Sequence, residues 1–163
     1  MRASRTLLLL LAAAGALQLL HYYPQLPETV ASHFDGAGRP NGFQSRSGFA
    51  AFCAAMLAMI VALFGGLGPL FRKFPSRWFN LPNRDYWLAA ERREETLDAI
   101  SAQLEWYGAA TLALYFVVIQ MVLETNQTPE RSLDSRSVWI VLGVYLLFTA
   151  VWTTRFILRF RKP

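Results

Sequence analysis

Four long apolar blocks constrain the fold of this chain more than any other feature of its sequence. They cover about residues 6–22, 48–71, 106–123 and 138–158. A bilayer core of about 30 Å needs about 20 helical residues. The last three blocks are close to or above that length, and the first, with about 17 residues, comes near it. The blocks predict an all-α membrane protein, a four-transmembrane-helix bundle in which residues 1–163 form a single membrane domain.

Composition excludes several other classes of protein. The residues are 54% hydrophobic and only 17% charged, which excludes a disordered or fibrous chain and argues against a soluble globular domain. The one cysteine, Cys53, excludes a disulfide within the chain and a zinc or iron–sulfur site built from this chain alone. Cys53 lies among Ala and Phe in the second block, so we expect a packed, inert thiol.

The first block has a competing interpretation as a signal peptide, because Arg2 and Arg5 precede its Leu/Ala run. Its small residues, however, lie inside the apolar run and not after it. The run also continues to Tyr22 and Tyr23, which are typical of a membrane interface. We therefore expect an uncleaved first span.

The distribution of Lys and Arg predicts the orientation of the four spans. Twelve of the 16 basic residues lie in the N-terminal segment, the loop 72–105 and the C-terminal segment, and four lie in the other two loops. This positive-inside pattern predicts that both termini lie in the cytoplasm. It also explains the net charge of +5 without a nucleic-acid partner, since aromatic residues do not alternate with these charges on one soluble face.

Two loops are expected outside the membrane on the opposite side. The outer loop, residues 23–47, is rich in Pro and Gly, and Pro40-Asn41-Gly42 predicts a tight turn. Residues 29–34 fit either a short strand or one helical turn. The loop is too short for a core of its own, so it must pack on the membrane surface or on the helix ends. The second outer loop, residues 124–137, is polar and featureless.

The cytoplasmic loop, residues 72–105, is predicted to contain an amphipathic helix. Leu97, Ile100 and Leu104 are spaced for one helical face over residues 91–103, and we expect this helix to continue into the third span. Earlier in the loop, aromatic residues such as Trp78 and Trp87 are suited to the headgroup level of the membrane.

Residues that could carry chemistry are few. His33, in Ser32-His33-Phe34-Asp35, could contact a metal ion or hydrogen-bond its own loop, but its spacing from other ligands matches no compact metal motif. No nucleophile–base pair and no phosphate-binding loop is visible. No Asp, Glu, Lys or His lies at mid-membrane depth, which argues against a pump or coupled transporter. Gln18 and Gln120 lie within spans and are expected to bond between helices. We predict no enzymatic activity, no cofactor and no metal site.

Two motifs resemble a known family. Leu26-Pro27-Glu28, followed by the stretch from His33 to Gly42, resembles the signature of the domain of unknown function 1648. Pro82-Asn83-Arg84-Asp85-Tyr86-Trp87 is similar to a cytoplasmic loop often found with it, although Ala90 stands where that loop usually has Pro. The resemblance extends over about residues 18–104.

The resemblance implies a small bacterial inner-membrane protein, similar to the membrane portion of the sporulation delaying protein immunity family. Some of those proteins protect against a secreted peptide toxin and sequester a repressor. It favours a non-enzymatic sensor, immunity or accessory protein; the alternatives are a structural subunit of a membrane complex and a small transporter or membrane enzyme. Its partners would be the lipid bilayer and a membrane protein complex or a peptide ligand. The ligand- or partner-binding residues would be Glu28, His33, Asp35, Arg39 and Asn41. The cytoplasmic motif would comprise Asn80, Asn83, Arg84, Asp85, Tyr86 and Trp87.

Overall fold

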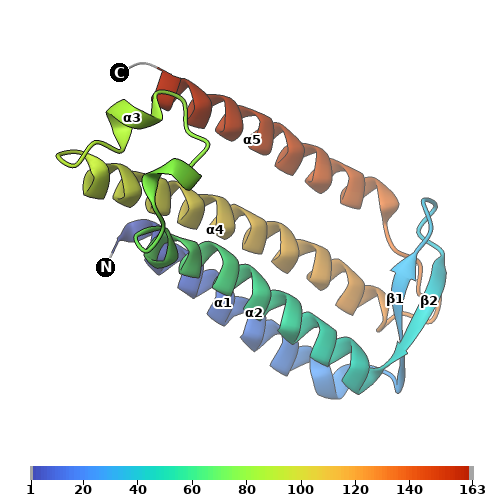
Figure 1. The fold of residues 1–163 in the computed structure, drawn as a ribbon. Coiled ribbons are helices and arrows are strands. Elements are labelled where there is room, and N and C mark those ends of the chain that lie inside the picture. Colours follow the sequence, from blue (N-terminus) through green and yellow to red (C-terminus); the bar gives the residue numbers. More distant parts are fainter. Residues whose placement is uncertain (1, 162–163) are drawn as a thin grey trace.

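The computed structural model describes residues 2–161, and four long helices dominate it (Figure 1). They are α1 (Ala3–Tyr22), α2 (Arg46–Phe71), α4 (Arg93–Thr125) and α5 (Ser135–Arg161). Each contains one of the predicted apolar blocks, and each is long and apolar enough to cross a membrane. The prediction of a four-span helical membrane protein is confirmed.

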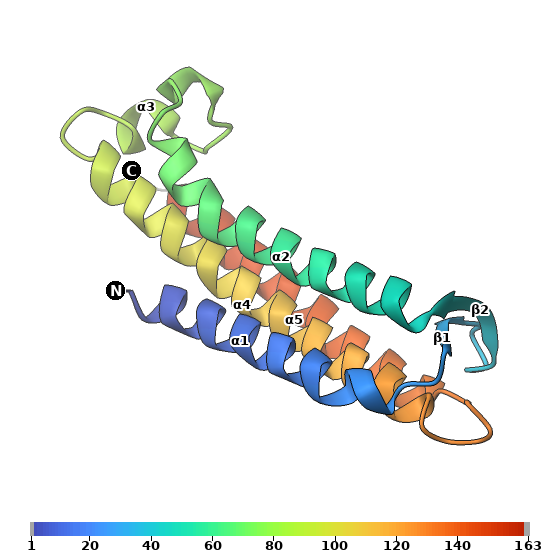
Figure 2. The ribbon, with the colours of Figure 1, turned by 90° about the horizontal axis from the view of Figure 1, so that it is seen from below.

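Three of these helices form a packed unit, in which α1 and α2 both lie against α4 (Figure 2). Small residues permit the close approach: Gly108 of α4 lies against Phe64 of α2 and leaves no room for a side chain. The predicted amide contact is also present, since Gln18 of α1 donates to the Oε1 atom of Gln120 on α4 at 2.7 Å. A polar bond of this kind stabilises helix association in lipid, where the amide has few other partners.

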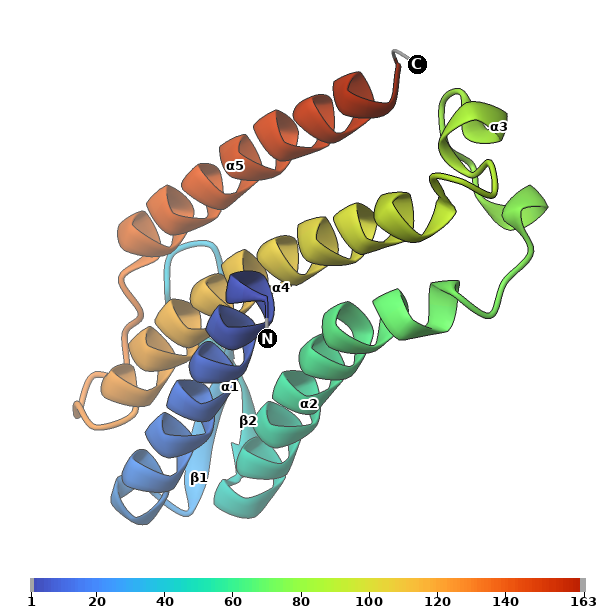
Figure 3. The ribbon, with the colours of Figure 1, turned by 90° about the vertical axis from the view of Figure 1, so that its left-hand side faces the viewer.

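Helix α5 stands apart from this unit and packs mainly on α4 (Figure 3). Its contacts are aromatic and hydroxyl-bearing. Tyr107 and Thr149 approach to 3.2 Å through their hydroxyl groups, and Thr111 and Tyr145 to 2.8 Å. The ring of Tyr107 also packs 4.7 Å from that of Trp152, centroid to centroid. Large side chains at the contact hold the two helices apart, which is a feature that hydropathy alone does not predict.

Both ends of the chain lie at one end of the helices, here called the termini end, and a small sheet covers the other, the hairpin end (Figure 1). Strands β1 (Thr29–Phe34) and β2 (Pro40–Ser45) pair antiparallel, with Ala31 opposite Phe43. A short 3-10 turn, η1 (Tyr23–Gln25), links α1 to the sheet. Of the two structures expected for residues 29–34, the strand is correct. The hairpin packs on the helix ends, which is one of the two placements expected for the loop 23–47.

At the termini end, the connection from α2 to α4 contains η2 (Ser76–Trp78) and the short helix α3 (Arg84–Trp87). The amphipathic segment expected over residues 91–103 forms the first turns of α4, which begins at Arg93 and runs on into the third span without a break. Leu97 and Ile100 are buried against the bundle. Ser101 lies very close to Gly68 of α2: a Cβ atom added to Gly68 would be 2.5 Å from the Oγ atom of Ser101. Gly68 therefore permits close packing of α2 on α4, and α2 continues unbroken past it to Phe71.

Candidate functional site

One buried amide fixes the hairpin to the end of α4. The Asn126 side chain accepts a hydrogen bond from the backbone N–H of Ala31 at 2.8 Å and donates one to the carbonyl oxygen of Ala31 at 2.9 Å. Asn126 is 4% exposed, and Val30 and Ala31 are fully buried. Because a buried backbone group without a partner is costly, these two bonds set the position of β1 on the helix end.

The tip of the hairpin is held by the connection between α4 and α5. The backbone N–H of Leu133 donates to the carbonyl oxygen of Gly38 at 2.9 Å, and the guanidinium of Arg131 donates to that of Thr29 at 3.2 Å. Gly38 has a φ of 82°, and a side chain there would overlap the carbonyl oxygen of Leu133. The expectation that residues 124–137 are featureless is wrong, because their side chains and backbone bind the hairpin.

The turn between the strands is closed by Asp35. Its Oδ1 atom accepts hydrogen bonds from the backbone N–H groups of Ala37 and Arg39, both at 2.9 Å. A carboxylate that bonds the backbone two residues on is typical of tight turns. The turn predicted at Pro40-Asn41-Gly42 is therefore wrong: these residues belong to β2, and the chain reverses over residues 35–39. Asp35, expected among the partner-binding residues, is engaged inside the turn.

The other expected binding residues are exposed at the hairpin end. They are Glu28, His33, Arg39 and Asn41. The His33 ring lies against Gly42, whose Cβ position would be 3.1 Å from the Nδ1 atom, and Nδ1 is 3.1 Å from the hydroxyl of Ser32. No group of three or more His, Cys, Asp and Glu residues that could hold a metal ion is found within residues 2–161. His33 is thus held by its own hairpin, with one side of the ring open.

Strand β2 forms the outer edge of the hairpin. The backbone N–H and C=O groups of Ala31 point to Asn126, so Ala31 and its partner Phe43 do not bond each other. The N–H and C=O groups of Phe43 therefore point outward from the opposite edge of the sheet. Outside the β1–β2 ladder itself, no backbone hydrogen bond of Phe43 is found within residues 2–161. Its side chain is 53% exposed, and Asn41 and Ser45 are exposed on the same side of the strand. This edge presents unpaired backbone groups next to an exposed aromatic ring.

The cytoplasmic motif expected from the sequence lies at the termini end, where it caps α5. The Nδ2 atom of Asn83 donates to the carbonyl oxygen of Arg161 at 2.7 Å, and the indole N–H of Trp87 donates to that of Phe160 at 3.0 Å. The rings of Trp87 and Phe160 meet edge to face at 5.4 Å. Asn83 adopts the left-handed conformation, with a φ of 49°. These residues satisfy carbonyl groups that the last turn of a helix leaves free.

The remaining motif residues make lesser contacts. Arg84 pairs with its exposed neighbour Asp85 at 2.9 Å. The guanidinium of Arg92 lies 3.9 Å from the centre of the Tyr86 ring, a cation–π contact. Asn80 is exposed. The motif is therefore a structural clasp, in which Asn83 and Trp87 make the contacts that join separate elements.

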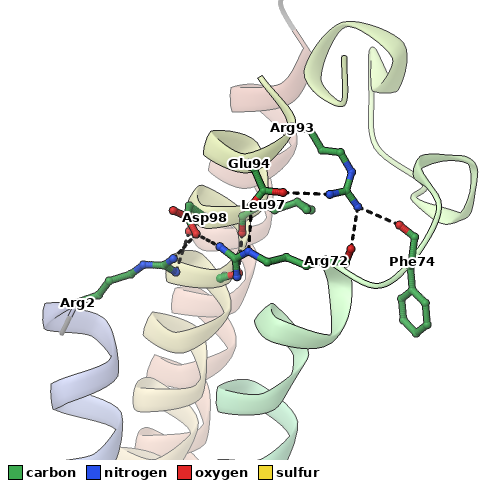
Figure 4. A network of polar contacts seen from close by, with 8 residues as sticks. Arg2, Arg72, Phe74, Arg93, Glu94, Leu97 and Asp98 are labelled. Carbon is green, nitrogen blue, oxygen red and sulfur yellow. Dashed lines mark hydrogen bonds and ion pairs between the residues drawn. The ribbon is translucent and has the colours of Figure 1, made fainter. Parts of the chain in front are cut away.

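A network of charges joins three helices at the same end (Figure 4). Asp98 of α4 bonds both Arg2, next to α1, and Arg72, which follows α2. Arg72 also pairs with Glu94 at 3.1 Å, and this bond raises the pKa of the Arg72 guanidinium above its usual value. The carboxylate of Asp98 is 48% exposed. The network was not predicted, because the first and last partners are 96 residues apart in sequence.

One carboxyl group is buried beside this network. Glu105 is 3% exposed, and its Oε2 atom accepts a hydrogen bond from the Ser4 hydroxyl at 2.6 Å. With Arg2, Arg5, Arg72, Ser101 and Pro69 it lines a cavity of about 240 Å³. Glu105 lies near the termini end, directly before the apolar block 106–123.

The four apolar helices define a multi-pass membrane protein. Residues 8–64, which cover most of α1, the hairpin and most of α2, match the family Domain of unknown function (DUF1648), so this part of the chain is similar to that family. The match ends before the second motif at residues 82–87. Comparison with curated proteins and with solved structures finds no match for the chain.

Proposed function

We propose that this chain is a non-enzymatic inner-membrane protein that contacts a ligand or partner through the β1–β2 hairpin. The observation that carries the proposal is the contrast within the hairpin. One edge is bound through Asn126, while the other edge and the side chains of Arg39, Asn41 and Phe43 are free toward the surroundings. A rigidly held, half-open hairpin is suited to binding, because little conformational entropy is lost when a partner docks.

The chemistry of the open edge favours an extended peptide as the partner. Such a segment adds to a free strand edge through main-chain hydrogen bonds and takes its specificity from alternate side chains. Phe43 supplies an apolar contact, and Arg39 at the tip supplies a positive charge. A peptide ligand or an extended loop of a membrane protein complex fits this description. The immunity role implied by the sequence resemblance is one case of it.

Site-specific photo-crosslinking tests the proposal. A crosslinking residue at Asn41 or Phe43 should yield a discrete adduct in membranes. The same residue at Arg136, exposed at the same end but outside the hairpin, is the matched control. Arg39→Ala should weaken the adduct without lowering protein abundance. His33→Ala should do the same if His33 contacts the partner, and should instead lower protein abundance if the residue only holds the hairpin together. Identical adducts from the hairpin and from Arg136 would reject the proposal. A stoichiometric partner that survives detergent purification would favour the structural-subunit alternative.

We place the hairpin end outside the cytoplasm and both termini inside it. The support is the distribution of charge: twelve of the 16 basic residues belong to segments at the termini end. Labelling with an impermeant thiol reagent tests this orientation. In a Cys53→Ser background, Ser47→Cys should react from outside in intact cells, and Ser76→Cys should react only after the membrane is opened. Reaction of both from the same side contradicts it.

A further inference from the structure

A groove runs along the membrane-embedded side of the molecule between α5 and the α1–α4 pair. It consists of two adjoining cavities of about 570 Å³ and 390 Å³, which share Gln103, Phe148 and Trp152 as lining residues. The first continues along α5, and the second extends across α4 to Leu7 and Leu11 of α1. The groove exists because the aromatic contacts of Tyr107 hold α5 away from its neighbours.

The polar groups of the groove gather toward the termini end, and their charge has one sign. Arg155 and Arg159, one helical turn apart on α5, both line the larger cavity beside Gln103. Neither arginine makes an ion pair within residues 2–161, and no Asp or Glu lines either cavity. Glu95 shares a small neighbouring cavity with Arg159 but forms no ion pair with it. Arg155 is the charge that interrupts the apolar block of α5, and a charge at such a position points to function.

A further donor in the groove has no partner. The indole Nε1 atom of Trp152 is buried and unbonded in the described part of the chain. Buried N–H groups are nearly always satisfied, and the side chain of Trp152 lines both cavities. Gln103, which lines both cavities together with Trp152, adds the N–H donors of a side-chain amide. Away from these groups the lining is apolar, with Val144, Leu147 and Val151 along α5.

We propose that this groove binds an anionic phospholipid, with the phosphate on Arg155 and Arg159 and one acyl chain along the apolar part. The ligand must carry an acceptor-rich anion at one end and an apolar chain at the other, and it must reach the groove from within the bilayer. Basic pockets between transmembrane helices bind anionic headgroups in this way. A second copy of the chain fits less well, because copies with the same membrane orientation would bring Arg155 and Arg159 of both α5 helices to the same depth.

Native mass spectrometry of the protein in mild detergent tests the proposal, with phosphatidylglycerol and phosphatidylcholine supplied in equal amounts. We expect retained phosphatidylglycerol. Arg155→Gln with Arg159→Gln should weaken its binding by about 30-fold, the effect of two charges near a membrane surface. The matched control is Arg136→Gln, which removes an arginine at the other end of α5 and should retain the lipid. Trp152→Phe keeps the ring and should weaken binding by a smaller factor.

Leu147→Trp narrows the apolar part of the groove, leaves Arg155 and Arg159 unchanged, and should also displace the lipid. Thermal unfolding and gel filtration of each variant show that it is folded. Equal retention of the two lipids by the wild-type protein overturns the proposal, as does undiminished binding to the folded double-arginine variant. Stabilisation by inorganic phosphate alone to the same extent would show a free-anion site, and a detergent-stable dimer that excludes lipid would assign the groove to a second copy.

Discussion

The two ends of the helix bundle are held together by different physical means. At the hairpin end the fastening is neutral and buried: the amide of Asn126 satisfies the backbone of Ala31. At the termini end a charged, half-exposed network joins the helices: Arg2, Arg72 and Asp98 share bonds near solvent. A buried group that loses its partner carries the full desolvation cost, whereas an exposed ion pair contributes about 0–1 kcal/mol. Single substitutions should therefore matter more at the hairpin end.

The largest effect is expected for Asn126→Ala. It leaves the N–H and C=O groups of Ala31 buried without partners, so we expect a loss of about 2–4 kcal/mol in the free energy of unfolding. Thermal unfolding measures the loss, and trypsin should cut faster after Arg39 at the freed tip. Gln127→Ala, which removes an adjacent exposed amide, is the control. An Asn126→Ala protein as stable as the control would remove the basis of the comparison.

An intermediate effect is expected for Trp87→Ala at the termini end. This change removes the bond to the carbonyl oxygen of Phe160 and the packing of the two rings, at a cost of about 1.5–3 kcal/mol. Folded yield and thermal unfolding provide the measurement. Trp78, 64% exposed in the same loop, and Arg84 are matched controls whose change to Ala should cost much less. Equal losses for Trp87→Ala and Trp78→Ala would mean that the loop is a tether and not a clasp.

The smallest effect is expected for Asp98→Asn. Its partners Arg2 and Arg72 are each more than a third exposed at the side chain, so solvent screens the interaction. We expect a loss of about 1 kcal/mol or less, decreasing as salt is added. Thermal unfolding across a salt series measures it. A larger loss of unfolding free energy that does not depend on salt would show that the charge network behaves as a buried one. The hairpin end and the termini end would then be held by interactions of similar strength.

The spans were predictable because length and apolar content alone decide whether a helix can cross a bilayer. The importance of Asn126 was not, because a single Asn in a polar loop forms no pattern and its partner is 95 residues away. Local turn signals misled for a related reason. Asn41-Gly42 has turn-forming residues, yet pairing with β1 overrides them, and Asp35 and Gly38 form the turn. The bond from Trp87 to the end of α5 was not predicted, because its partner Phe160 is 73 residues away in sequence. The interactions that position the candidate site are polar and join residues far apart in the sequence. A hydropathy pattern contains no information about such pairs.

The attachment of the hairpin to Asn126 imposes an order on biosynthesis. Residues 29–45 leave the ribosome well before the residue that anchors them, and 95 residues of synthesis take about 5–20 s at common elongation rates. During that interval the strands have no Asn126 and no Leu133 to bind. The hairpin surface therefore matures only after α4 has been inserted, and a nascent chain stalled earlier would display an unfinished hairpin to the proteases of its compartment.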